Sequence, residues 1–225
     1  MAQNMVKVKV WDLPTRLFHW AMLCLLGGLW WTADVGEMQW HMLLAYTLMI
    51  LLAMRLLWGV LGSDTARFSH FVHSPKKVVT YLVNVKQTGI SSSMGHNPVG
   101  GYMVVALFLL LSVQLISGLF ATDDVFTEGP LYAYVSHDVA SGLTWLHKKN
   151  FDLILAFAAI HVFAVILHTI KGDSIIPAMF SGYKRLPESH VSRVNFVSVT
   201  KAILMVLVIG FLVVNYLMLP VIEQL

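Results

Sequence analysis

The chain has 225 residues, of which 57% are hydrophobic and only 12% are charged, and its mean hydropathy is +0.72. A soluble domain of this size carries about 25% charged residues. The composition therefore excludes an ordinary cytoplasmic enzyme or a disordered chain and indicates a polytopic membrane protein. The single cysteine, Cys24, excludes a disulfide framework, a Cys-ligated iron–sulfur cluster and covalent haem attachment. The net charge is only +3, and no basic tract of the kind that binds nucleic acid is present.

Five stretches are predicted to cross the membrane, because each approaches the roughly 20 apolar residues that a span requires. They are residues 17–33, 40–61, 98–121, 148–170 and 201–219. Between the second and third, Ser74-Pro75 is a helix start, and the Val, Leu and Lys residues after it predict a short amphipathic helix on the inner membrane surface. We expect one membrane domain, with a core over 11–180 and an inner linker plus an additional helix over 181–225.

The placement of positive charge predicts the orientation. If the five spans alternate in direction, every Lys and Arg except Lys148 and Lys149 falls on the same side of the membrane. The positive-inside rule then puts the N-terminus in the cytoplasm and the C-terminus outside.

Histidines inside or at the ends of these spans are the candidate functional residues, because an ionisable side chain in a membrane is costly and marks a functional site by default. They are His19, His41, His147, His161 and His168. For any one of them alone, a hydrogen bond to a neighbouring helix or a place at the membrane surface is an equal alternative.

Their spacing favours two sites at different depths. His147 and His161 are 14 residues apart, which is roughly 21 Å along a helix and within about 40° of the same face. His19 matches the inner depth of His161, and His41 matches the outer depth of His147. Two stacked bis-histidine sites are what two b-type haems require. The alternative is a histidine-lined metal-ion or proton transporter without haem, but Asp152 is the only acid near a core span to complete such sites.

Two arginines are candidate partners of an inner haem. Arg16 precedes His19 by three residues, and Arg55 follows His41 by 14 residues on the same helix face, at its inner end. A guanidinium there pairs well with haem carboxylates. Anchoring of the inner helix ends by positive charge is an equal alternative for both.

Four segments resemble the prokaryotic cytochrome b561 family, which includes the b-type cytochrome subunit of membrane-bound nickel–iron hydrogenases. They are WDLPTRLFHW at 11–20, HMLLAYTLMILLAMRLLWGVLG at 41–62, GHNPVGG at 95–101 and LHKKNFDLILAFAAIHVFAVILH at 146–168. The resemblance implies an all-α, four-helix transmembrane bundle holding two non-covalent haem b groups, with the fifth, C-terminal helix as an addition. By the same resemblance, the axial ligands are His19, His41, His147 and His161.

The resemblance also implies electron exchange between membrane quinone and a periplasmic partner, a hydrogenase or a c-type cytochrome, at the bacterial inner membrane. His168 is the rival ligand, but it lies roughly 31 Å from His147 along a helix, the whole thickness of the core, so we assign it to propionate or quinone surroundings. His96, Asn97 and Gly100 are expected to line a quinone pocket; the alternative for Asn97 is a helix cap. A membrane anchor with structural haems is a third hypothesis for the whole chain.

Overall fold

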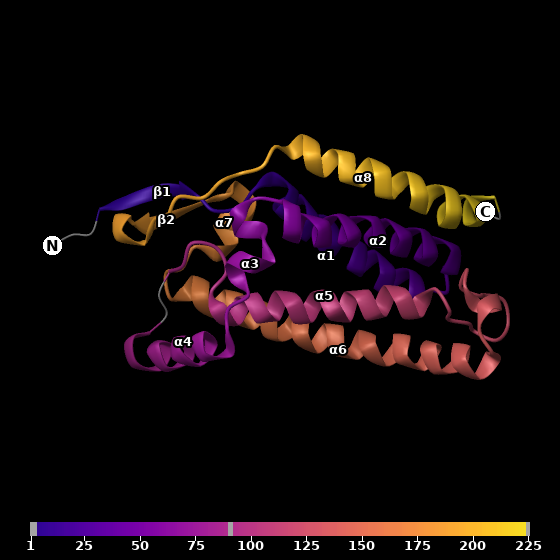
Figure 1. The fold of residues 1–225 in the computed structure, drawn as a ribbon. Coiled ribbons are helices and arrows are strands. Elements are labelled where there is room, and N and C mark those ends of the chain that lie inside the picture. The colour runs from indigo at the N-terminus through magenta and orange to yellow at the C-terminus, as the bar shows by residue number, and fades with distance from the viewer. Residues whose placement is uncertain (1–3, 90–91, 224–225) are drawn as a thin grey trace. The chain divides into compact units, whose positions relative to one another are not determined.

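The computed structural model describes residues 4–89 and 92–223 (Figure 1). They form two compact units. The first unit contains Met1–Trp20, Met54–Val105 and Ile160–Met205, and the second contains Ala21–Ala53, Ala106–Ala159 and Val206–Leu225. Each unit therefore takes one part of every long helix.

Helices dominate both units. The long ones are α1 (Leu13–Asp34), α2 (Met38–Leu61), α5 (Pro98–Gly118), α6 (His137–Ile170) and α8 (Val199–Val213). After α8 the chain continues through a π-helical turn (Val214–Met218) into the short α9 (Leu219–Ile222). The other short elements are α3 (Phe68–Phe71), α4 (Pro75–Thr88), α7 (Ile175–Ser181), β1 (Met5–Lys9) and β2 (Tyr183–Pro187).

Four helical segments of the described residues are long and apolar enough to cross a membrane: Met38–Leu61, Pro98–Gly118, His137–Ile170 and Val199–Ile222. They correspond to four of the five predicted spans, including the additional C-terminal one. The first predicted span is a continuous helix, α1, of 22 residues, but its mean hydropathy is lower than that of the four segments above. Arg16, His19 and the final Asp34 all make α1 more polar, so its crossing stays a prediction.

In the second unit, the turn from α1 to α2 and the polar side chains of the helices suit an apolar environment. The α1–α2 turn contains Gly36, whose φ of +79° is costly for residues with a side chain. Along the helices, hydroxyls donate to the carbonyl four residues earlier, as Thr47 does to Leu43 at 2.8 Å. A polar side chain satisfied by its own helix can face lipid or packed side chains at low cost.

The first unit contains a two-stranded antiparallel sheet that the sequence analysis did not predict. β1 pairs with β2 in a register that sets Lys7 opposite Arg185. Leu186 of β2 forms a buried hydrophobic cluster with Val10, Trp11 and Ala178. The "inner linker" is thus partly folded against the N-terminal segment.

The segment leading to α8 is also fixed. The carboxylate of Asp64 accepts the backbone N–H of Asn195 at 2.8 Å and its side-chain amide at 3.2 Å. Ser63 Oγ accepts the backbone N–H of Val197 at 3.0 Å. Through these bonds the chain is held to the end of α2 just before α8 begins.

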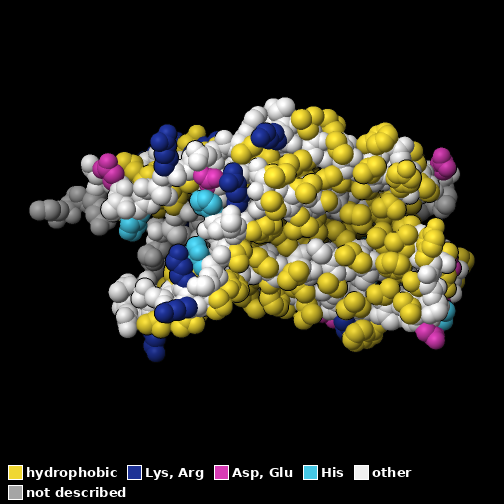
Figure 2. Space-filling view, in the orientation of Figure 1, with side chains coloured by type: hydrophobic (Ala, Val, Ile, Leu, Met, Phe, Trp, Pro, Cys, Tyr) yellow, Lys and Arg dark blue, Asp and Glu magenta, His cyan; other side chains and the backbone are white. Residues whose placement is uncertain are grey.

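The predicted amphipathic helix is confirmed as α4, which has Pro75 in its first turn and no buried residue. Val79, Leu82 and Val83 are all exposed. Figure 2 shows hydrophobic side chains covering the long helices, and Lys and Arg side chains gathered over the parts that carry β1, β2 and α4. The membrane-surface position of α4 remains a prediction.

Candidate functional site

Two of the candidate histidines face each other in the second unit. The ring centres of His41, near the start of α2, and His147, on α6, are 6.4 Å apart with an interplanar angle of 74°. His41 Nδ1 lies 2.9 Å from the carbonyl oxygen of Leu29, and His147 Nδ1 lies 2.9 Å from that of Gln114. The structure therefore brings together the pair that the sequence matched by depth.

These backbone contacts fix the chemistry of both rings. A carbonyl oxygen only accepts hydrogen bonds, so Nδ1 carries the proton in each ring and Nε2 keeps a free lone pair. A metal–imidazole bond is about 2 Å long, so two imidazoles that share one metal have ring centres roughly 6 Å apart. The separation of His41 and His147 matches that geometry. Anchoring of the second nitrogen on a carbonyl is the usual support of a metal-ligating histidine.

Three neighbours on α5 and α6 support His147: Gln114, Gly118 and Asn150. Asn150 is buried, and its Nδ2 donates to Leu110 O at 2.9 Å and to Gln114 Oε1 at 2.8 Å. At Gly118, a Cβ atom would lie only 2.9 Å from His147 Cε1. No sequence pattern marks Gln114 and Asn150, because their role depends on which turns of α5 and α6 lie next to each other.

The inner candidates gather in the first unit. The His96 ring packs edge-on against Trp11 and against Phe71, with ring centres 4.7 and 4.6 Å away. Burial lowers the pKa of His96 to about 3, and the nearby positive charge of Arg55 and charge on His161 and His19 act in the same direction. These four side chains are therefore electrostatic neighbours.

Several buried polar atoms of the first unit have no hydrogen-bond partner among the described residues. They include His19 Nδ1, His96 Nδ1 and Arg16 Nε. Buried polar groups in native proteins are almost always satisfied. A set of imidazole and guanidinium nitrogens suits a metal-centred group that carries carboxylates, so the residues present fit haem.

The two arginines differ from surface anchors. Arg16 donates to the carbonyl of Phe180 on α7. Arg55 is only 2% exposed, donates to Ala66 O at 3.3 Å and lies within electrostatic range of the Asp12 carboxylate. A charged side chain buried to this degree cannot anchor to lipid headgroups, so the anchoring alternative does not fit Arg55.

The capping alternative for Asn97 is confirmed. Its Oδ1 accepts the backbone N–H of Gly100 at 2.7 Å, as a helix cap does at the start of α5. Its Nδ2 lies 3.4 Å from His168 Nε2, and His168 Nδ1 lies 3.2 Å from Asp173 Oδ2. Both nitrogens of His168 thus have hydrogen-bonding neighbours.

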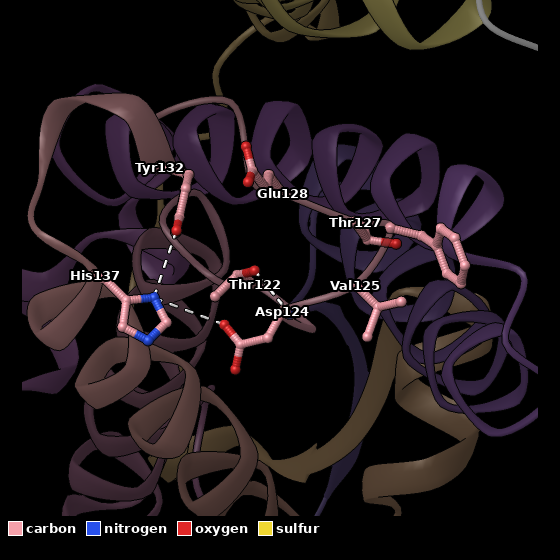
Figure 3. A pocket seen from close by; sticks show the side chains of 8 residues that line it. Thr122, Asp124, Val125, Thr127, Glu128, Tyr132 and His137 are labelled. Carbon is pink, nitrogen blue, oxygen red and sulfur yellow. Dashed lines mark hydrogen bonds and ion pairs between the residues drawn. The ribbon is translucent and has the colours of Figure 1, made fainter.

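A further pocket lies in the loop between α5 and α6 (Figure 3). It has a volume of about 460 Å³ and is lined by Thr122, Asp124, Val125, Phe126, Thr127, Glu128, Tyr132 and His137. The Asp123 carboxylate accepts the backbone N–H groups of Thr127, Val125 and Phe126, which hold its pKa well below the usual value. His137 Nδ1 lies 3.5 Å from the Tyr132 hydroxyl. This loop is ordered by its own hydrogen bonds, and none of the predicted site residues lies in it.

Among residues 4–89 and 92–223, no group of three or more His, Cys, Asp and Glu side chains is arranged to hold a metal ion by itself. Of the candidate histidines, His41 and His147 face each other as a pair. In comparisons with known proteins, residues 10–182 match the family model described as prokaryotic cytochrome b561. No curated protein and no solved structure gave a match.

Proposed function

Because the chain belongs to the prokaryotic cytochrome b561 family, we propose that it is a dihaem b-type membrane cytochrome that carries electrons between the quinone pool and a periplasmic redox partner. The family membership makes it a multi-pass bacterial membrane protein of electron transfer that binds b-type haem. The observation that supports bis-histidine haem binding is the His41–His147 pair. Its ring centres are 6.4 Å apart, and both Nδ1 atoms contact backbone carbonyl oxygens.

In this proposal, His41 and His147 would hold an outer haem as its ligands. The carbonyls of Leu29 and Gln114 hold the two rings in the tautomer that presents Nε2. A bound b-type haem takes up and releases one electron at a time. Gly118 gives α5 the close approach to His147 that the site needs.

His19 and His161 are the proposed axial ligands of an inner haem. Arg16 and Arg55 would neutralise its carboxylates through charge-assisted hydrogen bonds. The partnerless Nε of Arg16 supports the pairing with carboxylates. His96 lies with this group and would pack beside the same haem.

In this proposal, the substrate that comes from the membrane is a quinone. It would bind at the cytoplasmic ends of the spans, close to Asn97, Gly100 and His168. The N-terminus would lie in the cytoplasm and the C-terminus in the periplasm, where a hydrogenase or a c-type cytochrome would exchange electrons. Lys148 and Lys149 follow His147 on that side, which favours an acidic partner or a cytochrome with an exposed haem edge.

A haem count on the detergent-purified chain tests the proposal. We expect two haem b per polypeptide by the pyridine haemochrome assay. His41→Ala or His147→Ala should remove only the outer haem, and His19→Ala or His161→Ala only the inner one. His190→Ala, at an exposed position, is the matched control and should retain both. A chain with no haem would overturn the proposal and favour a histidine-lined transporter. Two haems that are never reduced by quinol would favour a membrane anchor with structural haems.

A further inference from the structure

Asp12, the residue before α1, is a buried acid that has no role in the haem assignments. It is only 3% exposed. Its Oδ1 accepts the backbone N–H of Thr15 at 3.0 Å, and its Oδ2 accepts the indole N–H of Trp58 at 2.8 Å. The carboxylate therefore joins the start of α1 to α2 within the first unit.

Helix capping explains only part of this arrangement. An aspartate before a helix caps it by accepting the N–H group three residues later, but serine or asparagine does so equally well without a charge. A buried carboxylate is costly unless an opposite charge lies close to it. The charge of Asp12 therefore requires a cationic partner.

Arg55 is that partner. It precedes Trp58 by three residues on α2, so the two side chains lie on the same face of the helix. The bond from Trp58 holds the Asp12 carboxylate beside this face, where its charge acts on the buried guanidinium of Arg55. Arg55 is itself held by a hydrogen bond to the carbonyl oxygen of Ala66 at 3.3 Å.

The same arginine belongs to the inner histidine group. Arg55 and both proposed ligands of the inner haem lie within electrostatic range of His96. The His96 ring also packs edge-on against Trp11, the residue next to Asp12, with ring centres 4.7 Å apart. Asp12 therefore contributes a fixed negative charge to the residues that we assign to the inner haem.

The other buried acids of the first unit have different partners. Among the acids that are buried in the described part of the chain, Asp64 accepts hydrogen bonds from Asn195, and Asp173 forms an ion pair with Lys184. In the second unit, none of the described Asp and Glu residues is buried. Asp12 therefore distinguishes the inner site from the outer one.

The charges of a loaded inner site balance when Asp12 is included. A ferric haem b has one positive charge at its centre and two negative charges on its carboxylates, and Arg16 and Arg55 supply two positive charges. One positive charge remains, and the Asp12 carboxylate cancels it. Charge interactions are strong in a buried site, so the carboxylate favours the oxidised form of the haem over the reduced form.

We infer that Asp12 is the fixed counter-charge of the inner haem site, held beside Arg55 by its bond from Trp58, and that it lowers the reduction potential of the inner haem. This inference rests on the proposed function. The outer haem lacks this influence. The difference favours electron transfer from the inner haem to the outer one, which is the direction from the membrane quinone toward the periplasmic partner.

The test is a redox titration of the detergent-purified, haem-loaded protein, with haem b per polypeptide measured on the same samples. The inner haem is identified as the one that His161→Ala removes. Asp12→Asn keeps the size of the side chain and an oxygen that can cap α1, but it removes the charge. At a given solution potential, we expect the ratio of reduced to oxidised inner haem to increase about tenfold, which equals a rise of about 59 mV in a one-electron potential. The outer haem should titrate as before.

Three further variants separate the charge from the helix cap. Asp12→Ser caps α1 without a charge and should raise the inner potential as Asp12→Asn does. Asp12→Glu restores the charge and should bring the ratio back to within a few-fold of the unmodified protein. Glu188→Gln removes an exposed acid of the same unit and should leave both haems unchanged.

A purely structural role of Asp12 predicts a different result. Asp12→Asn would then bind two haems with unchanged potentials, and only the thermal stability would fall; this result would overturn the inference. If both neutral variants lose the inner haem, Asp12→Glu decides the question: retention of that haem supports the counter-charge, and its loss overturns it. A chain that never binds haem would instead overturn the proposed function.

Discussion

Gly118 provides a sharp test of the outer site. In Gly118→Ala, the new Cβ would lie 2.9 Å from His147 Cε1 and 3.2 Å from its Nδ1. Ordinary contact begins near 3.4 Å, so the ring must move by about 0.5 Å or tilt. Either motion weakens the 2.9 Å hydrogen bond from Nδ1 to the Gln114 carbonyl.

The magnitude follows from the role of that bond. Loss of an outer partner of a metal-bound histidine typically costs about 10–100-fold in affinity for the metal group. We expect an effect of this size on the outer haem. Gly118 is the last residue of α5, and alanine is a better helix former than glycine, so helix propensity does not account for a loss of haem.

The matched control is Gly27→Ala, another helix glycine of the same unit, where a Cβ would meet nothing within 4 Å. Both variants receive the same assays: haem b per polypeptide and a redox titration that separates the two haems. We expect Gly27→Ala to match the unmodified protein and Gly118→Ala to lose or shift the outer haem only. Equal haem content and equal potentials in the two variants would show that His147 is not held as described.

The remaining predictions concern supporting contacts. Asn150→Leu removes two hydrogen bonds between α5 and α6 and should lower the free energy of unfolding by about 1–2 kcal/mol, measured by thermal unfolding in detergent. The control is Asn215→Leu, which changes an exposed asparagine bonded within its own helix and should have little effect. The pKa of Asp123 is depressed, so its bonds are complete above the ordinary carboxyl range and are lost as the pH falls through the lowered value. Proteolysis of the α5–α6 loop in the unmodified protein should therefore increase only in strong acid. In Asp123→Ala the loop should be cleaved rapidly at neutral pH. An Asp123→Ala protein that resists cleavage would contradict the role of the Asp123 hydrogen bonds. Asp64→Ala releases the Asn195 contacts, so cleavage between residues 191 and 198 should increase with haem content unchanged.

The sequence was most informative where function depends on side-chain type and helical period. The 14-residue spacing of His147 and His161, together with chain direction, predicted that His41 and His147 would meet, and the structure shows that they do. Their role as ligands remains a prediction. The helical cap at Asn97 and the amphipathic helix α4 followed from equally local signals.

Contacts that depend on the backbone or on distant segments escaped the sequence analysis. The carbonyls of Leu29 and Gln114 orient both outer histidines, yet a carbonyl is present at every position and marks none. Asp173 and Lys184 were indistinguishable from loop charges until the fold buried them against each other. In β1, apolar residues alternate with Lys7 and Lys9. Because this segment directly precedes the first predicted span, its lysines were interpreted only as the positive charges that flank a span.

The pairing of β1 with β2 has a consequence for biosynthesis. β1 is made first, but its partner strand follows only after the seven α-helices α1 to α7 have been synthesised. At a bacterial rate of about 5–20 residues per second, the N-terminal strand waits roughly 9–35 s for its partner. During that interval its unpaired edge is available to other chains. A fusion or tag placed directly before Met5 would affect the unpaired strand during this delay. It should change the yield of folded protein rather than the stability of the protein once folded.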